Sequence, residues 1–377
     1  MQWIATTGYG LEGVLANELR DMNLNVPDVQ TSRVLFEGSV QDACRANLWL
    51  RTAGHVALVT GSFEAKDFDS LFDQVRAIPW EDYLPSDARF PVTARCINSQ
   101  LMSVPDCQRI VKKAISSRLM SHYHINWCSE NGPQMPIELH IWKDQATLSI
   151  NVSGQPLHVR GYRRLNGPAA IRETLGAAMV LLSHWHSDRV LIDPFCGTGT
   201  LMIEAAMKAR NMAPGLNRTF AGEKFGFMPL TAWRDARQEA RDLAKRNLRL
   251  SIIGSDNDPE ALSMSRYHAK QAGVADAIRW EERDVRDLAC EQGYGVIITN
   301  PPYGQRLNDV KEAQALYSVL GQRYRALNGF SCHVITADDR FESYFGRMAN
   351  KKRLLYNGPL RCRYYQYFGP RPPRSGE

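Results

Sequence analysis

One stretch of the chain ends an apolar run with an amide, two prolines and an aromatic ring, Val296-Ile-Ile-Thr-Asn-Pro-Pro-Tyr-Gly-Gln-Arg306. An amine on an aromatic base is a poor nucleophile because its lone pair is delocalised into the ring. Two acceptors that hold its hydrogens, the Asn300 side-chain oxygen and the Pro301 carbonyl, would pull the nitrogen toward tetrahedral geometry. Pro301 and Pro302 would keep these acceptors in place, and Tyr303 offers a flat face on which an extruded base can stack. The simpler alternative is a turn that ends a strand.

A second pattern lies earlier, where Val190-Leu-Ile-Asp193-Pro-Phe-Cys-Gly197-Thr-Gly199 reads as a buried strand followed by a glycine turn and a helix. A dinucleotide fingerprint would need a third glycine where Met202 stands, and no Gly-Lys-Ser/Thr triphosphate loop follows. The remaining Asp-x-x-x-Gly-x-Gly pattern resembles the first motif of S-adenosylmethionine-dependent methyltransferases. That resemblance implies that Gly197 and Gly199 pass beneath the cofactor and that Asp193 helps to fix its amino-acid end. The intervening Phe195 and Cys196 would then line the same site.

Acidic residues also end the two strands expected next. Asp256 ends Ile252-Ile-Gly-Ser-Asp, and its carboxylate could accept both ribose hydroxyls, with Asn257 beside it. Asp284 and Val285 follow the next strand, where they could receive the adenine. Each acid could also be a turn residue or a helix cap, but together they support one cofactor site. Transfer of a methyl group from a sulfonium to an amine held by Asn300 needs no strong base.

The elements that must position these residues alternate regularly in the second half. Strands are expected at 189–193, 251–255, 278–282, 295–299, 331–336 and 363–368, with helices at 168–185, 200–210, 260–272 and 309–327. Strands separated by helices predict a doubly wound, mostly parallel α/β sheet, whose strand ends would carry the residues above. Residues 211–248 are expected to be an irregular, charged insertion in one crossover.

The sequence pattern of the first half predicts an α+β region with mixed sheets. Strands are expected at 3–7, 32–37, 55–60, 89–96, 136–142 and 145–152, and helices at 11–19, 40–50, 67–78 and 105–119. A turn-rich, basic stretch follows and indicates a linker at 156–167.

Composition narrows the class of protein. No signal peptide or membrane span is expected, and eight scattered cysteines without a Cys-x-x-Cys pair indicate reduced thiols and a cytoplasmic protein. No metal site is expected, because the two His-x-His pairs at 122–124 and 184–186 lack a third ligand at sensible spacing. Residues 1–160 carry 14 Lys/Arg and 17 Asp/Glu, so the basic excess lies in the second half. A basic face suits phosphate backbones, although a merely solvated face is an equal alternative.

Further motifs extend the resemblance over nearly the whole chain. They are Thr7-Gly-Tyr-Gly-Leu-Glu12, Phe63-Glu-Ala-Lys-Asp-Phe-Asp69, Ser103-Val-Pro-Asp-Cys107, His158-Val-Arg-Gly-Tyr-Arg163, Arg172-Glu-Thr-Leu-Gly176, Met212-Ala-Pro-Gly-Leu-Asn217 and Asn300-Pro-Pro-Tyr-Gly304. With these the chain resembles the THUMP-domain RNA guanine-N2 methyltransferases, close to the first half of the RlmL-type large-subunit rRNA enzyme.

The resemblance implies a ferredoxin-like region at 1–65, a THUMP domain that binds structured RNA at 66–155 and a class I, Rossmann-like methyltransferase domain at 168–377. It places Thr174 near the cofactor and implies methylation of guanine N2, in 23S rRNA or alternatively in tRNA. The sequence departs from the family at Gln305, where Glu is frequent, and no second methyltransferase domain follows. Oligomeric state is left open.

Three alternative functions are considered for the same residues. An adenine-N6 methyltransferase acting on nucleic acid would hold its target amine with Asn300 in the same way, and so would a protein methyltransferase acting on glutamine amides. The RNA-binding first half disfavours both. A catalytically silent RNA-binding protein is disfavoured because the Asp193 loop and the Asn300 turn are both intact.

Overall fold

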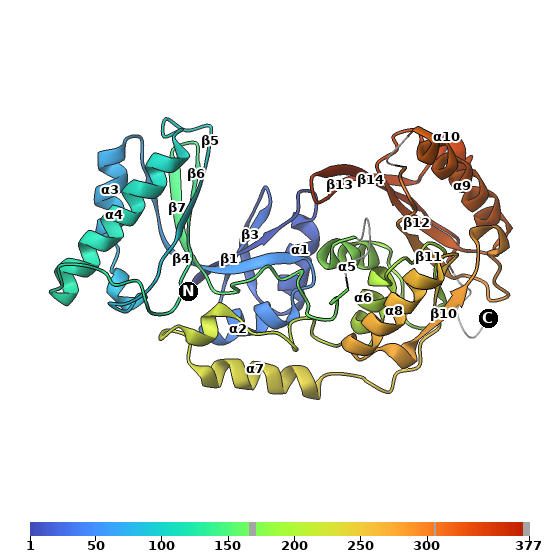
Figure 1. The fold of residues 1–377 in the computed structure, drawn as a ribbon, viewed down its shortest axis with the longest axis horizontal. Coiled ribbons are helices and arrows are strands. Elements are labelled where there is room, and N and C mark those ends of the chain that lie inside the picture. The colour runs from blue at the N-terminus through green and yellow to red at the C-terminus, as the bar shows by residue number, and fades with distance from the viewer. Residues whose placement is uncertain (166–170, 305–306, 372–377) are drawn as a thin grey trace.

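The computed structural model describes residues 1–165, 171–304 and 307–371. Two seven-stranded sheets form the two ends of an elongated molecule (Figure 1). The first sheet has the order β2-β3-β1-β4-β7-β6-β5. Its strands are β1 (Gln2–Thr7), β2 (Asn25–Gln30), β3 (Arg33–Glu37), β4 (Ala53–Glu64), β5 (Val92–Ile97), β6 (Ile137–Trp142) and β7 (Gln145–Asn151). The helices of this half are α1 (Glu12–Asp21), α2 (Val40–Trp49), α3 (Phe68–Ala77) and α4 (Val104–Tyr123), with a 3₁₀ turn η1 (Trp80–Asp82).

The twelve-residue strand β4 joins the two parts of this sheet. Its first residues pair with β1, from Ala53 opposite Thr7 to Leu58 opposite Trp3. Its later residues pair with β7, as far as Glu64 opposite Gln145. The ferredoxin-like and THUMP regions expected from the sequence therefore share one continuous sheet.

The second sheet has the order β10-β9-β8-β11-β12-β14-β13 and confirms the expected class I methyltransferase fold. Strands β8 to β12 run parallel, and β14 is antiparallel to them. The edge strand β13 pairs antiparallel with β14 and therefore runs in the same direction as β8 to β12. The strands are β8 (Leu191–Asp193), β9 (Ile252–Asp256), β10 (Ile278–Glu282), β11 (Val296–Thr299), β12 (Ser331–Thr336), β13 (Lys351–Asn357) and β14 (Leu360–Tyr367). The helices are α5 (Glu173–Leu182), α6 (Thr200–Ala209), α7 (Leu230–Asp242), α8 (Pro259–Ala272), α9 (Leu307–Ala326) and α10 (Phe341–Phe345). Short 3₁₀ turns are η2 (Ala221–Lys224), η3 (Ala275–Ala277) and η4 (Val285–Asp287).

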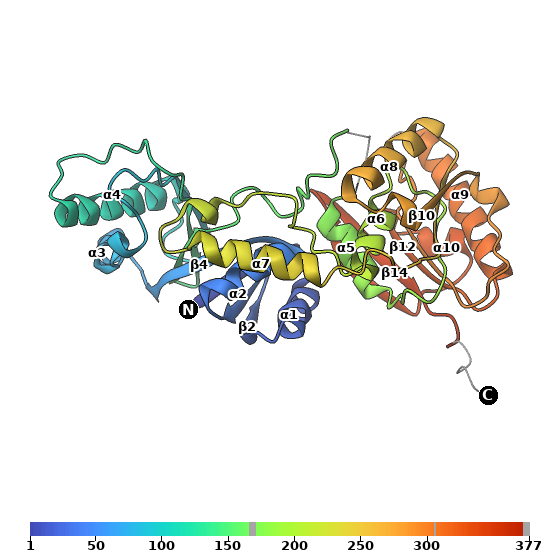
Figure 2. The ribbon, with the colours of Figure 1, turned by 90° about the horizontal axis from the view of Figure 1, so that it is seen from below.

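Residues 211–248 lie in the crossover between α6 and β9 as expected, but their middle forms η2 and α7, so the expectation that the stretch is irregular was wrong. Helix α7 lies along the first half of the molecule, beside α2 (Figure 2). Its Trp233 is fully buried and stacks on Phe220 with ring centroids 4.9 Å apart, in the same apolar core as the first sheet. An ion pair of 2.9 Å joins Arg45 of α2 to Glu239 of α7. The second half of the chain thus returns a segment to the first half, and this segment holds the two halves together.

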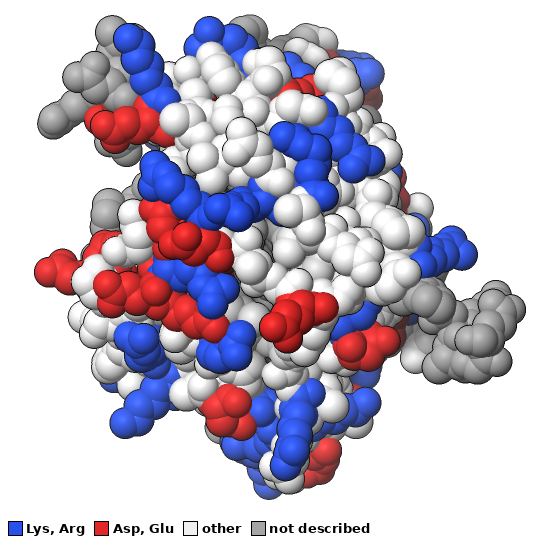
Figure 3. Space-filling view, turned by 90° about the vertical axis from the view of Figure 1, so that its right-hand side faces the viewer, with Lys and Arg blue, Asp and Glu red and all other residues white. Residues whose placement is uncertain are grey.

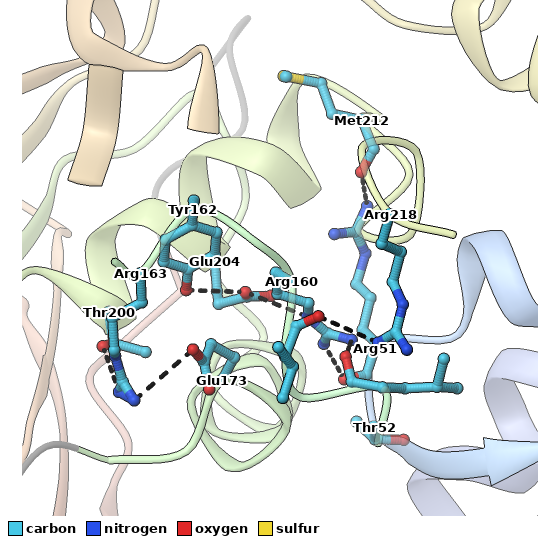
Figure 4. Close-up of polar contacts among 12 residues, drawn as sticks. Arg51, Thr52, Arg160, Tyr162, Arg163, Glu173, Thr200, Glu204, Met212 and Arg218 are labelled. Atoms are coloured by element: carbon cyan, nitrogen blue, oxygen red, sulfur yellow. Dashed lines mark hydrogen bonds and ion pairs between the residues drawn. The ribbon is translucent and has the colours of Figure 1, made fainter. Parts of the chain in front are cut away.

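A buried polar network reinforces this junction (Figure 4). Arg160 of the linker forms an ion pair of 3.5 Å with Glu204 of α6, and both side chains are almost completely buried. The Tyr162 hydroxyl donates to the same Glu204 carboxylate at 3.1 Å. Arg51, from the first half, donates to the Met212 carbonyl at 2.8 Å. Because a buried charge is tolerated only when it is paired, these contacts fix the linker against both halves.

Some expectations fall outside the described residues. These include the beginning of the helix expected from Pro168, the end of the linker and the Gln305 departure. Within the described ranges no helix is long and apolar enough to cross a membrane. The same part of the chain contains no group of three or more His, Cys, Asp or Glu side chains able to hold a metal ion.

Candidate active site

A cavity of about 360 Å³ opens at the carboxyl ends of β8, β9 and β11. It lies where ligands bind in open α/β sheets, and its volume is within the range of small-molecule sites. Both Gly197 and Asn300 line it, so the glycine turn and the Asn-Pro-Pro-Tyr turn face one space. The predicted site residues that line it are Asp193, Phe195, Cys196, Gly197, Asp256, Asn257, Asp284, Val285, Asn300, Pro301, Pro302 and Tyr303.

Asp193 ends β8 in a buried position. Its carboxylate accepts a hydrogen bond of 2.6 Å from the Thr299 hydroxyl at the end of the neighbouring strand β11, and another of 3.1 Å from the Phe195 amide. Burial raises the pKa of Asp193 to about 7, and the nearby Asp256 carboxylate adds to the effect. A nearby cation stabilises the ionised form of a buried carboxylate, and the amino-acid end of S-adenosylmethionine carries a positively charged ammonium group.

The two positions of the turn require glycine for different structural reasons. Gly197 adopts φ +50°, and a Cβ at this position would meet nothing within 4 Å, so its backbone is bare toward the cavity. Gly199 caps α6 with φ +82°, and a Cβ there would lie 2.7 Å from the Trp280 ring. The first glycine therefore leaves room for a ligand, whereas the second leaves room for a side chain of β10. Gly199 does not line the cavity.

Asp256 and Asp284 reach the cavity from the ends of β9 and β10. Asp256 accepts a 2.8 Å bond from the Gly197 amide and a 3.1 Å bond from the Asp258 amide, so it also holds the glycine turn. Burial raises its pKa. Asp284 caps η4 by accepting from the Arg286 amide at 2.7 Å and forms an ion pair with the Arg286 side chain. Both acids thus have a local structural role in addition to facing the cavity.

Asn300 is oriented by its own turn. The Tyr303 hydroxyl donates a short hydrogen bond to the Asn300 side-chain oxygen, and burial raises the pKa of Tyr303 further above its usual value. The Tyr317 hydroxyl of α9 donates to the Pro302 carbonyl at 2.8 Å and also contacts the Thr336 hydroxyl at 3.1 Å. The turn is therefore tied to the end of the adjacent strand β12. The bond from Tyr303 to Asn300 was not expected from the sequence.

A second, larger cavity of about 980 Å³ adjoins the first, and Pro302, Tyr303 and Leu316 line both. Its walls come from the beginning of α5, from α9, from the loop after β12 and from the turn between β13 and β14. Asp309, Glu312 and Asp338 contribute carboxylates to this cavity, and Arg172 and Arg340 contribute guanidinium groups. The Asn300–Tyr303 turn thus separates a space of cofactor size from a wider space open to a larger molecule.

Thr174 and Gly199 are the predicted cofactor residues that do not line the first cavity. Several lining residues were not expected from the sequence: Ile171, Pro194, Thr198, Thr200, Leu201, Asp258, Ala261, Met264, Arg283 and Leu316. Most are apolar or lie on helices α6, α8 and α9, where a periodic apolar pattern indicates only a buried face. Thr299, which orients Asp193, could have been found because it precedes Asn300 at the end of a neighbouring strand.

These residues fit S-adenosylmethionine. The bare backbone at Gly197 gives close approach, the Asp193 carboxylate suits the ammonium group, and Asp256 can accept from hydroxyls. The apolar Val285 and Phe195 side chains complete walls against which a flat ring can pack. Fold and cavity together define a class I, S-adenosylmethionine-dependent methyltransferase.

The comparison with protein families agrees with this class. Residues 160–366 match the RMKL-like methyltransferase domain, residues 65–151 match the THUMP domain and residues 2–57 match the RlmL ferredoxin-like domain. The chain therefore belongs to the RMKL-like methyltransferase family.

Two curated relatives extend over nearly all of the chain. "Putative RNA methyltransferase YpsC" of Bacillus subtilis is 42% identical over 375 residues, which are 99% of this chain and 97% of that protein. "Ribosomal RNA large subunit methyltransferase K/L" of Syntrophotalea carbinolica is 34% identical, over 97% of this chain and 53% of that protein. The chain thus spans about half the length of this K/L relative.

Solved structures agree in fold. A protein of Listeria monocytogenes described as a "predicted N6-adenine-specific DNA methylase" has a TM-score of 0.93 and 44% identity, covering 98% of this chain and 96% of that one. The structure of SMU.472 complexed with SAH has a TM-score of 0.91 and 39% identity, covering 99% of both chains.

Proposed function

We propose that the protein transfers the methyl group of S-adenosylmethionine to the exocyclic N2 amine of a guanine in RNA, and that the RNA is 23S rRNA. The observation that carries the proposal is that Gly197 and Asn300 line the same cavity. A substrate in ribosomal RNA also places the enzyme in the cytoplasm. The names of the Bacillus and Syntrophotalea relatives support RNA as the substrate class.

The chain's own residues can activate the amine. The Asn300 side-chain oxygen has two lone pairs, and the Tyr303 hydroxyl uses one of them, which orients the amide and leaves the other for an amine hydrogen. The Pro301 carbonyl accepts the second hydrogen. When bound, the cofactor supplies an electrophilic methyl group on a sulfonium. The nitrogen loses its extra proton after methylation, so no strong base is needed.

The second cavity supports guanine over adenine. Guanine presents N–H donors at both N1 and N2, whereas the N1 atom of adenine is an acceptor. The carboxyl groups of Asp309, Glu312 and Asp338 line the cavity beside the Asn300 turn, and an ionised carboxylate accepts hydrogen bonds but donates none. An edge with two neighbouring donors fits such walls better than an edge that alternates donor and acceptor.

The surface charge is compatible with an RNA partner but does not form one basic patch. On the end of the molecule that carries the second sheet, acidic side chains gather on one side, and Lys and Arg are spread over the face (Figure 3). The first half has an acidic balance overall. RNA contacts in that half would therefore depend on local geometry and single basic residues, and less on net charge.

The test is methyl incorporation from labelled S-adenosylmethionine into RNA, DNA and protein taken from cells that lack the protein. Transfer into RNA, followed by digestion and identification of N2-methylguanosine, is the expected result. N6-methyladenosine, or label confined to DNA or protein, would refute the proposal. Separation of large-subunit rRNA from tRNA in the same experiment identifies the substrate RNA.

A further inference from the structure

Two tyrosine rings, one from each half of the chain, meet at the surface. Tyr9 lies in the loop between β1 and α1, and Tyr356 lies near the end of β13. Their ring centroids are 5.9 Å apart at an interplanar angle of 87°. Tyr9 is 50% exposed and Tyr356 is 40% exposed, so both rings keep a large apolar area in water. Exposed rings of this kind offer flat apolar faces on which an unstacked base can pack.

The docking of the two halves at this point does not depend on these rings. Gly10 has φ +85°, and a Cβ there would lie 2.5 Å from the Leu354 carbonyl, so the loop packs directly on the β13 backbone. Leu11 is buried in the core of the catalytic half. The Glu12 carboxylate accepts from the Gly10 amide at 2.9 Å and holds the loop in shape. Tyr9 is therefore presented on a fixed loop while its own ring stays accessible.

The tyrosine pair lies at the hairpin whose turn forms part of the wall of the larger cavity. Asn357, Gly358 and Leu360, in the turn between β13 and β14, line that cavity, and Tyr356 directly precedes them. The hairpin of β13 and β14 reaches from the second sheet toward the first half (Figure 1). Because side chains alternate along a strand, Tyr356 points to the opposite face of the hairpin from Asn357 and Leu360. An RNA strand that leaves the cavity would therefore pass around this turn to reach the two rings.

Positive charges near the tyrosine pair suit the phosphates of an RNA strand. Arg361 lies directly opposite Tyr356 in the β13–β14 ladder, so their side chains share one face of the sheet. Arg172 lines the cavity from the beginning of α5. Both arginines are exposed, and neither forms an ion pair within the ranges that the structure describes. The carboxylates inside the cavity repel a phosphate group, whereas these two exposed arginines attract the phosphates of a strand that leaves the cavity.

We propose that Tyr9 and Tyr356 form a stacking platform for an RNA nucleotide that flanks the methylated one, with Arg361 and Arg172 contacting the phosphates between them. Aromatic side chains are sequence-tolerant partners for unstacked bases, and nearby cations hold the backbone. The platform rests on the proposed function, because it needs a single-stranded RNA segment at the catalytic turn. It also gives the first half a contact with the substrate close to the reacting base.

The test compares the wild-type protein with variants in steady-state methylation of large-subunit rRNA, which is taken from cells that lack the protein. The Tyr9→Ala/Tyr356→Ala double variant is expected to raise KM for RNA roughly ten- to a hundred-fold, with kcat and SAH affinity unchanged. The Tyr9→Phe/Tyr356→Phe variant keeps both rings and is expected to behave as wild type. Phe368→Ala is the matched control, because Phe368 is 42% exposed and follows the last residue of β14, at the end of the hairpin away from its turn.

A second measurement does not depend on removing a ring. Arg361→Gln is expected to lower the slope of the logarithm of RNA affinity against the logarithm of salt concentration by about one phosphate contact. An unchanged KM in the double alanine variant, an equal loss in the phenylalanine variant, or an unchanged salt slope would overturn the platform. Absence of methyl transfer to RNA by the wild-type protein would instead refute the proposed function.

Discussion

Replacing Asp193 with Asn should make the protein more stable and bind its cofactor less well. Asp193 is almost completely buried, and its pKa is raised by burial from 3.8 to about 7. Because each pKa unit corresponds to about 1.36 kcal/mol, the ionised carboxylate costs up to about 4 kcal/mol of stability at pH 8. Asn carries no charge and still accepts from the Thr299 hydroxyl and the Phe195 amide.

The sign of the pH dependence follows from the raised pKa. Below about pH 4 the carboxyl group is protonated in the folded and the unfolded protein, so Asp193 costs nothing. As pH rises toward 7 the unfolded state loses this proton first, so wild-type stability falls relative to the variant, and above 7 the difference is constant. The stability advantage of Asp193→Asn should therefore be about 3 kcal/mol larger at pH 8 than at pH 5.

Urea unfolding of both proteins at pH 5, 6.5 and 8 measures this difference, and comparison at equal pH cancels the other titrating groups. Calorimetry with SAH should show at least tenfold weaker binding by the variant, because a charge-assisted contact to the ammonium group is lost. The affinity of the wild-type protein for SAH should rise about tenfold between pH 5.5 and 6.5, because Asp193 ionises over this range while the amine of SAH stays charged. The variant should show no such rise. A stability difference that is equal at all three pH values, or unchanged SAH affinity, would refute the reasoning.

The remaining predictions concern the glycine turn and the buried network. Gly199→Ala should lower the free energy of unfolding by about 2–4 kcal/mol, because its Cβ would meet the Trp280 ring at a positive φ. Gly197→Ala should cost only about 1 kcal/mol but weaken SAH binding at least tenfold, and equal effects of the two variants on stability would contradict the assignment. Glu204→Gln should cost about 3–5 kcal/mol in urea unfolding, because it leaves Arg160 buried without an opposite charge. Asp235→Asn, in an exposed pair, is the control and should change stability by less than about 1 kcal/mol.

The ends of the parallel strands could be predicted from sequence because two signals coincide there. Apolar runs at β8, β9 and β11 are followed by Asp193, Asp256 and Asn300, and the doubly wound fold brings such ends to one edge. The family resemblance and the fold class were confirmed. Domain boundaries and the roles of individual site residues stay predictions.

Other features could not be predicted because tertiary contacts decide them. Helix α7 is rich in charge, and it packs against α2, about 190 residues earlier in the sequence, where Arg45 pairs with Glu239. Strand β13 begins with three consecutive basic residues, lacks the alternating pattern of a half-buried strand and pairs only with β14 among the described strands. The role of Gly199 depends on Trp280, which lies on a strand far away in sequence. The bond from Tyr303 to Asn300 depends on the conformation of a turn.

The central claim is that one cavity brings the cofactor methyl group to an amine held by Asn300. The most direct measurement is the single-turnover rate of methyl transfer by Asn300→Ala at saturating S-adenosylmethionine, with SAH affinity measured on the same protein. The account predicts a rate at least about a hundredfold lower with SAH affinity nearly unchanged, because an acceptor used in the transition state is lost. A wild-type rate, or loss of SAH binding in proportion to the rate, would contradict it.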